Sequence, residues 1–280
     1  MMSGYIGQDR FKIKSIKENV RMGANVLQLD QCGRCLPDYV IVATLAQSPR
    51  HYLDGGLLAL VSSAPALRSI NLSQCSLLTS ASIYILAESS KSLLKELHLD
   101  DCQGIDAALI LPALIELEHL EVLSVAGIQI VCDEFVKNYI VARGQNMKEL
   151  VLKDCINLTN ASIKAIVEHC PRLSVLDLMN LHKLTDLSIG HLTNGCCALH
   201  TLKLCRNPFS DEAIAAFVET TGGSLKELSL NNIKRYYKLL CFGLYIALKS
   251  GGALAFSLDW FISLIDRGGQ ELNPNNVVWR

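Results

Sequence analysis

The residue types that could do chemistry are concentrated in one stretch of the sequence, LKDCINLTNASIKAIVEHCPRLSVLDL. It contains Cys155, His169 and Cys170, together with the carboxylates of Glu168 and Asp177. Thiolates and imidazoles bind zinc, and a cysteine next to a histidine can act as a nucleophile. The stretch therefore raises two hypotheses, a metal site and a nucleophilic site, and the surrounding elements decide between them.

A second candidate is the pair Cys32 and Cys35 in CGRC, which has the spacing of half a structural zinc site. Such a site needs about four ligands. The next close pair in the chain is Cys196 and Cys197. Whether the two pairs could share a metal depends on how far apart the fold holds them.

An apolar phrase of the form L-x-x-L-x-L recurs along most of the chain. It returns at spacings of 26 or 27 residues, with a Cys, Asn or apolar residue three positions after its end. The phrase begins at Leu67, Leu94, Leu120, Met147, Leu173, Leu199 and Leu225. A period of this length and the phrase L-x-x-L-x-L-x-x-N/C are typical of leucine-rich repeats.

Each repeat can be read as a strand followed by a helix. The L-x-L part alternates with polar residues and predicts a short strand with one buried face. A Ser or Thr then precedes apolar residues at helical spacing and predicts a helix N-cap. These predicted caps are Thr79, Thr159, Thr185 and Ser210. Since one repeat cannot bury its apolar face alone, we predict an α/β leucine-rich-repeat solenoid (horseshoe) with a parallel inner sheet and outer helices.

This architecture argues against both chemical hypotheses. Strands stacked about 4.8 Å apart would hold the two cysteine pairs on the order of 30 Å apart, too far to share one zinc ion. Cys75, Cys102 and Cys155 fall at the turn after a strand and are expected to be buried thiols, as are the helix-end cysteines. Adjacent residues on a helix point in different directions, so His169 and Cys170 should not form a dyad.

No phosphate-binding or dinucleotide-binding loop is recognisable, because GGLLAL and TGGSL lack the required lysine and spacing. We therefore expect a non-enzymatic protein with no catalytic residues, no cofactor and no metal.

Composition excludes further classes of function. The chain has 280 residues, half of them apolar, and 26 Lys plus Arg against 27 Asp plus Glu, so no global field attracts nucleic acid or a membrane. Its first twenty residues contain no apolar run typical of a signal peptide. Eleven cysteines then indicate thiols in a reducing cytoplasm or nucleus.

The repeat phrase predicts three parts of the chain: a lead-in over 1–24, the repeat array over 25–234 and a divergent segment over 235–280. Three interpretations of the last segment remain open: a cap on the final repeat, a non-native tail from an altered transcript, or a membrane span interrupted by charges. We favour the cap.

One irregularity is expected inside the array. Cys32 and Cys75 are 43 residues apart, which is less than two periods. We therefore predict a truncated repeat near 46–57.

The repeats also resemble a known subtype. The pattern L-x-x-L-x-L-x-x-C-x-x-L-T-[DN], followed by a helix that ends in C-P, is clearest in LKELVLKDCINLTNASIKAIVEHCPRLSVLDLMNLHKLTD. It resembles the cysteine-containing leucine-rich repeats of F-box/LRR proteins. The segments LQLDQCGRCLPDYV, LRSINLSQCSLLT and LKLCRNPFSDEA are similar to plant relatives of the yeast nucleotide-excision-repair LRR protein, a ubiquitin-ligase-associated family.

In F-box/LRR proteins the array captures the substrate of an SCF ubiquitin ligase, while a separate F-box holds the adaptor. The resemblance implies a substrate-recognition subunit of a cullin ligase that acts in ubiquitin-dependent protein catabolism. The lead-in is shorter than an F-box and lacks the zinc segment of the repair relatives, so we expect this chain to hold only the recognition array. The alternative is a DNA-damage-recognition subunit in nucleotide excision repair.

The expected binding surface is the concave face of the sheet, where side chains alternate with the buried leucines. The candidate contacts for a protein substrate are Glu96, His98, Asp100, Glu149, Lys153, Asp177, Met179, Lys203, Arg206 and Asn231. A DNA-binding face needs a stripe of basic residues, whereas these strands offer only Lys153, Lys203 and Arg206. Direct DNA binding and membrane binding are therefore not expected.

Overall fold

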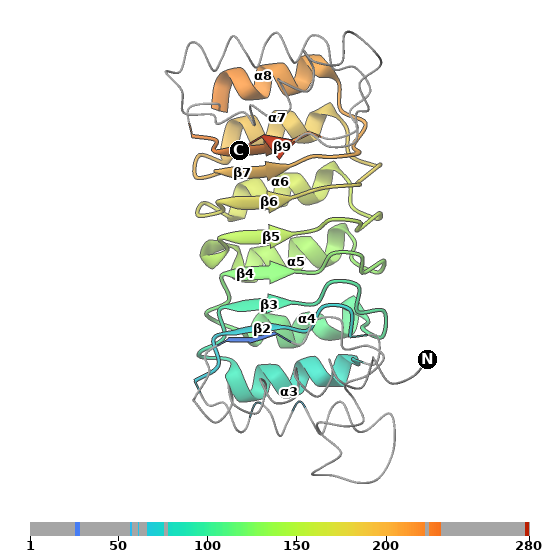
Figure 1. The fold of residues 1–280 in the computed structure, drawn as a ribbon, viewed down its shortest axis with the longest axis vertical. Helices are drawn as coiled ribbons and strands as arrows, with labels where there is room; N and C mark the ends of the chain where they lie inside the picture. Colours follow the sequence, from blue (N-terminus) through green and yellow to red (C-terminus); the bar gives the residue numbers. More distant parts are fainter. Residues whose placement is uncertain are drawn as a thin grey trace, which may run out of the picture. The chain divides into compact units, whose positions relative to one another are not determined.

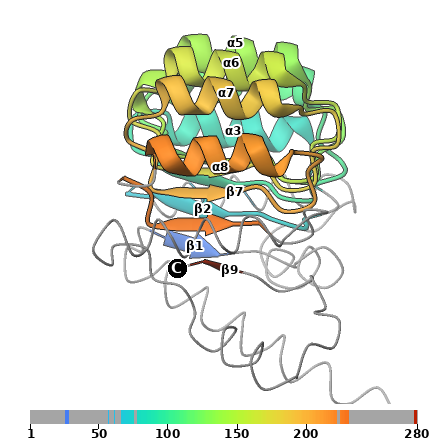
Figure 2. The same ribbon diagram turned by 90° about the horizontal axis from the view of Figure 1, so that it is seen from above.

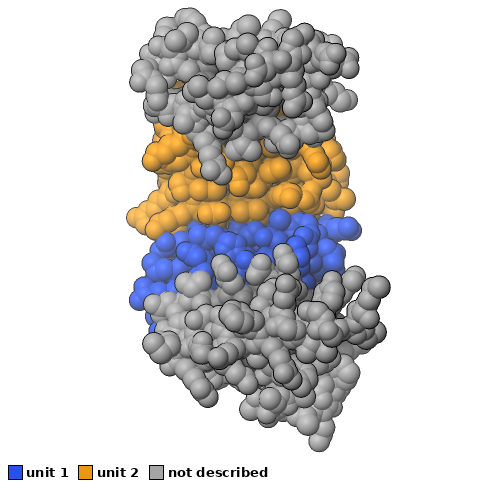
Figure 3. Space-filling model, in the orientation of Figure 1, with its two compact units in different colours: residues 1–130 blue, residues 131–280 orange. Residues whose placement is uncertain are grey.

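A computed structural model describes residues 26–28, 57, 61, 66–75, 78–221, 224–230 and 278–279 of the chain (Figure 1). They belong to two compact units, Met1–Ile130 and Val131–Arg280, which Figure 3 colours separately. Each unit repeats one motif, a short strand followed by a helix.

In the first unit, four parallel strands pair in the order of the sequence. Equivalent residues of successive repeats lie opposite one another, as Ile70, Leu97 and Leu123 do. The elements are β1 (Val26–Gln28), β2 (Ser69–Asn71), α3 (Ser80–Ser90), β3 (Glu96–His98), α4 (Ala107–Glu116) and β4 (Val122–Ser124).

In the second unit, Leu150, Leu176, Leu202 and Leu228 are register partners on four parallel strands. Its elements are α5 (Asp133–Arg143), the 3-10 turn η1 (Gly144–Asn146), β5 (Glu149–Val151), α6 (Asn160–His169), β6 (Val175–Asp177), α7 (Asp186–Gly195), β7 (Thr201–Lys203), α8 (Asp211–Thr221), β8 (Glu227–Ser229) and β9 (Val278–Trp279). The last strand, β9, pairs antiparallel with β8.

Within each unit the helices form one layer and the strands the other (Figure 2). The apolar phrase explains this arrangement, because its leucines are buried between the layers, as Leu97 and Leu176 are with no exposed surface. Helix residues at the predicted spacing meet them, such as the fully buried Ile163 and Ile166. Each such side chain contributes about 1.5–3 kcal/mol by leaving water. The predicted α/β leucine-rich-repeat fold is confirmed.

Four helices begin directly after their predicted N-cap residues. Thr159 shows the local reason, since its Oγ1 accepts a hydrogen bond from the N–H of Ala161 at 3.3 Å. The helices α3, α6, α7 and α8 follow Thr79, Thr159, Thr185 and Ser210.

A second set of bonds at the helix starts joins neighbouring repeats. The carboxylate of Asp133, the first residue of α5, accepts hydrogen bonds from the Thr159 N–H at 2.8 Å and from the Thr159 hydroxyl at 2.6 Å. It also accepts one from the buried Ser162 hydroxyl. Asn160 does the same for the next repeat, where its Oδ1 accepts from Thr185 N at 3.0 Å. The Asp or Asn that follows the N-cap residue therefore links its repeat to the next one.

After each of the strands β2 to β7, the turn has one residue in the left-handed region. Its φ lies between 57° and 70° in six successive repeats. The residues are Gln74, Asp101, Gly127, Asp154, Asn180 and Arg206. Gly, Asn and Asp tolerate this conformation, which explains four of the six. At Gly127 an added Cβ would also lie 2.0 Å from the carboxylate of Asp101.

The N/C position of the phrase holds a side chain that bonds to the preceding repeat. Cys102 donates from its Sγ to the carbonyl of Leu72 at 3.1 Å, and Asn207 donates from Nδ2 to the carbonyl of Leu178 at 2.8 Å. Cysteine and asparagine at this position therefore make the same kind of bond, from a buried turn to a carbonyl of the preceding repeat. Cys75, Cys102 and Cys155 are buried, as predicted.

Several predictions lie outside the described residues. These are the boundaries after residues 24 and 234, and the irregularity at 46–57 apart from Leu57. β1 pairs directly with β2, so these two repeats are adjacent. Among the helices of the described segments, none has the length and hydrophobicity needed to cross a bilayer.

Candidate protein-binding surface

In each unit the sheet surface turned away from the helices is here named the strand face. The period-two alternation that buries one side chain directs the next to this face. Of the predicted contact residues, Glu96, Lys153 and Arg206 are exposed, His98, Asp100, Glu149, Met179 and Lys203 are half-buried, Asp177 is buried, and Asn231 lies outside the described residues.

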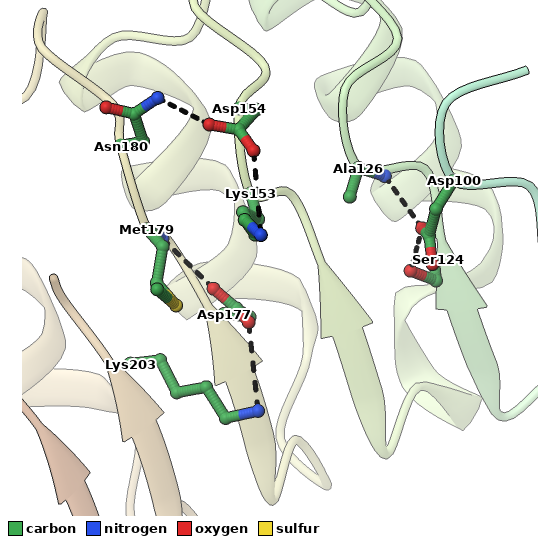
Figure 4. Close-up of polar contacts among 9 residues, drawn as sticks. All are labelled: Asp100, Ser124, Ala126, Lys153, Asp154, Asp177, Met179, Asn180 and Lys203. Atoms are coloured by element: carbon green, nitrogen blue, oxygen red, sulfur yellow. Dashed lines mark hydrogen bonds and ion pairs between the residues drawn. The ribbon is translucent and has the colours of Figure 1, made fainter. Parts of the chain in front are cut away.

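In the first unit, Asp100 links three successive repeats, and its bonds to Ser124 and Ala126 are drawn in Figure 4. Its carboxylate accepts hydrogen bonds from the Ser73 hydroxyl at 3.2 Å, from the Ala126 N–H at 3.0 Å and from the Ser124 hydroxyl. On the same strand, Glu96 accepts a bond from the hydroxyl of Ser69 at 2.7 Å. Both carboxylates thus stabilise the stack of repeats.

In the second unit, Asp177 is only 5% exposed, although the alternation predicts an outward side chain. One carboxylate oxygen accepts a bond from the Met179 N–H at 3.0 Å, and the other lies 3.8 Å from the ammonium of Lys203 (Figure 4). Burial raises the pKa of the Asp177 carboxyl above its ordinary value, and the Met179 N–H, Lys203 and Lys153 lower it by less. Folding therefore disfavours the charge on this side chain.

Lys153 and its neighbour Asp154 form a second ion pair at the ends of the strands. Their Nζ and Oδ2 atoms are 3.8 Å apart, and the same Asp154 carboxylate accepts a hydrogen bond from the Nδ2 of Asn180 (Figure 4). This bond joins the left-handed residues of two successive turns.

The structure brings together five of the predicted residues in the second unit. They lie on the consecutive repeats of β5, β6 and β7, where Val151, Asp177 and Lys203 are register partners. These residues are Lys153, Asp177, Met179, Lys203 and Arg206. Glu96, His98 and Asp100 lie together at β3 in the first unit. All three predicted basic residues therefore belong to the second unit, whereas the predicted acidic residues lie in both units, Glu96 and Asp100 in the first and Glu149 and Asp177 in the second.

Cys155, His169 and Cys170 occupy structural positions in the described repeats. Cys155 and Cys170 are buried, and burial raises the pKa of the Cys170 thiol to about 12. The Nδ1 of His169 lies 3.0 Å from the carbonyl of Ala165 in the preceding turn of its own helix. In the described part of the chain, no three His, Cys, Asp or Glu side chains are grouped so that they could hold a metal. Cys32 and Cys35 lie outside it.

Sequence reasoning missed two features near this surface. Cys205 follows the same outward alternation as Lys203, yet it is only 2% exposed. A small, weakly polar side chain is among the most often buried, and this property outweighed its position. The left-handed conformation of Arg206 was also missed, although the aligned Asp154 and Asn180 were a signal for it.

No protein-family model matches the sequence. Among solved structures, the chain is similar to one from the complex of Rad7 and Elc1 in yeast, with a TM-score of 0.52 and 19% identity over 78% of this chain. The match covers 61% of that yeast chain, so this chain spans less than two thirds of its length. At this identity the likeness shows the leucine-rich-repeat fold.

Two further structures are similar at lower scores. The leucine-rich-repeat protein LegL7 from Legionella pneumophila matches with a TM-score of 0.48 and 14% identity, over 84% of this chain and 94% of that one. A chain of the TLR13–ssRNA13 complex matches with a TM-score of 0.38 and 20% identity, over 61% of this chain and 26% of that one.

Proposed function

We propose that the chain is the substrate-recognition subunit of an SCF-type cullin ubiquitin ligase in the cytoplasm or nucleus, and that it holds a client protein on its strand faces. The observation that carries the proposal is the strand face of the second unit. There the half-buried Val151, Val175 and Met179 lie among charged side chains such as Lys153 and Lys203. An apolar centre with a polar rim is the usual anatomy of a protein interface.

The protonation states of the thiols support a binding role over an enzymatic one. Burial raises the pKa of Cys102 and Cys170 to about 12 and that of Cys196 to about 11, so these thiols are not nucleophiles near neutral pH. In a ligase the transfer of ubiquitin is done by other subunits, and a recognition subunit needs only to bind.

The test is affinity purification of the full-length gene product from its own cells with the proteasome inhibited. We expect cullin-ligase subunits and ubiquitinated clients in the purified material. Recovery of neither would refute the proposal. A variant with Lys153→Glu and Lys203→Glu should keep the ligase subunits and lose clients. The matched variant Lys164→Glu, on the outer face of α6 with a 61% exposed side chain, should keep both.

The alternative function, DNA contact within a repair complex, is weakened by the local charges. Two of the three cations on these strands, Lys153 and Lys203, each have a carboxylate within 3.8 Å. The carboxylates beside them interrupt the continuous basic stripe that a phosphate backbone needs. A gel shift of the purified chain with duplex DNA that weakens steeply as salt rises would favour the repair function instead.

A further inference from the structure

Two lysines on the second strand face have hydrogen-bond donors to spare. Lys153 and Lys203 each lie 3.8 Å from a carboxylate oxygen, which is beyond the length of about 2.7–3.2 Å for a hydrogen bond from nitrogen. Within the described residues, neither ammonium donates a hydrogen bond to the protein. Each ammonium carries three donors, so a partner carboxylate could bind both lysines without breaking an existing hydrogen bond.

Arg206 is held in a conformation that its side chain does not favour. Its φ is 62°, at the turn position where Asp154 and Asn180 gain from their short polar side chains and arginine does not. The guanidinium group is exposed and has no ion pair in the part of the chain that the structure describes. Strained residues of this kind are often retained at binding sites. A planar guanidinium is well suited to a partner carboxylate.

Met179 supplies an apolar element between these cations. It belongs to the repeat between those of Lys153 and Lys203, and it is half-buried beside Asp177 (Figure 4). A thioether side chain adapts its shape to an apolar partner group.

We propose that Lys153, Met179, Lys203 and Arg206 form one docking surface, the strand-end surface, for an acidic peptide segment that carries an apolar residue between its carboxylates. Three neighbouring strands span about 10 Å, which about three residues of extended peptide also span. Its carboxylates would reach Lys153, Lys203 and Arg206, while its apolar side chain would contact Met179. The assignment of this segment to a ligase client rests on the proposed function. The expected acidic and apolar character of the segment follows from the surface and does not depend on that function.

An acidic peptide fits this surface better than nucleic acid does. Asp154 and Asp177 lie among the cations and would repel a continuous phosphate backbone. A peptide can place its carboxylates at the cations and leave the protein's own carboxylates uncovered. Three cations also provide little of the charge on which nucleic-acid affinity depends.

The test is fluorescence anisotropy of the full chain with a short labelled peptide of glutamate and serine around one leucine. Three probes are compared with it: the same peptide with lysine for glutamate, the peptide without leucine, and a short DNA duplex. We expect the acidic leucine peptide to bind best, with an affinity that falls moderately as salt rises.

Variants that each remove one positive charge test where the peptide binds. Arg206→Asn and Lys203→Gln should each weaken the acidic peptide roughly fivefold to tenfold, as expected for a charged hydrogen bond that is partly exposed. Arg206→Asn should melt no lower than the wild-type chain, because Asn180 already occupies this turn position. The control Lys164→Gln removes a lysine with a comparable ion pair, 3.9 Å from Glu168, and should leave binding unchanged.

Equal binding of the acidic and basic peptides, unchanged binding by both strand-end variants, or tighter binding of DNA than of peptide would overturn the proposal. The affinity purification separates this proposal from the ligase function. Peptide binding without ligase subunits would refute the ligase function alone. Ligase subunits and clients without peptide binding would refute the strand-end surface alone.

Discussion

Asp133 provides the sharpest test of how the repeats are linked. Its carboxylate accepts bonds from the N–H and the hydroxyl of Thr159 and from the hydroxyl of Ser162, all in the next repeat. Replacing it with alanine removes both acceptor oxygens and with them all three hydrogen bonds. Thr159 is half-buried, so water can replace two of the bonds, whereas Ser162 has no exposed surface.

The expected loss of stability follows from this difference in exposure between Thr159 and Ser162. An orphaned buried hydroxyl costs about 1–3 kcal/mol, and the two solvent-accessible bonds add about 1 kcal/mol together. We therefore expect Asp133→Ala to lower the free energy of unfolding by about 2–4 kcal/mol. That is a large part of the roughly 5–15 kcal/mol that stabilises a typical domain.

Asp133→Asn is the matched control, because the chain already uses asparagine at this position. In the next repeat, Asn160 accepts from the Ser188 hydroxyl at 2.6 Å and donates from Nδ2 to the Thr185 hydroxyl at 2.8 Å. An asparagine at 133 can make the same bonds, so its cost should stay below about 1 kcal/mol.

The pH dependence adds an independent check. Burial alone would raise the pKa of Asp133, but the hydrogen bonds from Ser162 and Thr159 outweigh it and hold the pKa below the ordinary 3.8. The advantage of the wild-type carboxylate is therefore present above pH 3.8 and is lost as the pH falls through the lower folded pKa. The free energy of unfolding of Asp133→Asn should not show this pH-dependent contribution.

Urea unfolding followed by the helical circular dichroism signal measures these differences, and hydrogen exchange at the first amides of α6 shows whether the loss is local. The inter-repeat link would be refuted if Asp133→Ala were as stable as the wild type. It would also be refuted if the asparagine and alanine variants lost the same stability.

Three further predictions concern other parts of the described chain. Tyr139→Phe should raise the free energy of unfolding, measured with urea, by about 1 kcal/mol, because its buried hydroxyl has no hydrogen-bond partner among the described residues. In the same assay, Gly127→Ala should lower the free energy of unfolding by about 1–2 kcal/mol, because φ is 70° at this residue. Gly190→Ala, in the middle of α7 with open space around it, should raise the free energy of unfolding by about 0.5–1 kcal/mol. Labelling with a thiol reagent at pH 8, read by mass spectrometry, should modify the exposed Cys197 and spare the buried Cys102; labelling of Cys102 in the folded chain would contradict its role in the turn.

The period of the sequence predicted the strands and helices because each repeat must bury the same apolar positions. Leu150, Leu176 and Leu202 are buried register partners, as the phrase requires. The helix starts followed from capping chemistry that acts within a few residues, as at Thr159. Local periodicity thus determined the fold.

The candidate site was less predictable, because alternation gives the side of the sheet on which a residue lies but not what packs over it. Asp177 and Cys205 follow the outward pattern and are both buried. Bonds between residues 26 or 27 positions apart, such as those from Ser73 and Ala126 to Asp100, depend on how the repeats stack. No pattern within one repeat reveals them.

The hydrogen bonds between repeats separate two kinds of residue on the strand faces. Asp100 and Asp154 accept bonds from other repeats, so substituting them should disturb the stack before it disturbs a partner. Lys153, Lys203 and Arg206 make no hydrogen bond with their side chains within the described residues, so their charges stabilise the stack of repeats little. Surface ion pairs at 3.8 Å contribute less than about 1 kcal/mol. Substituting these cations should therefore change stability little, and if they form the proposed docking surface the same substitutions should weaken binding of the acidic peptide.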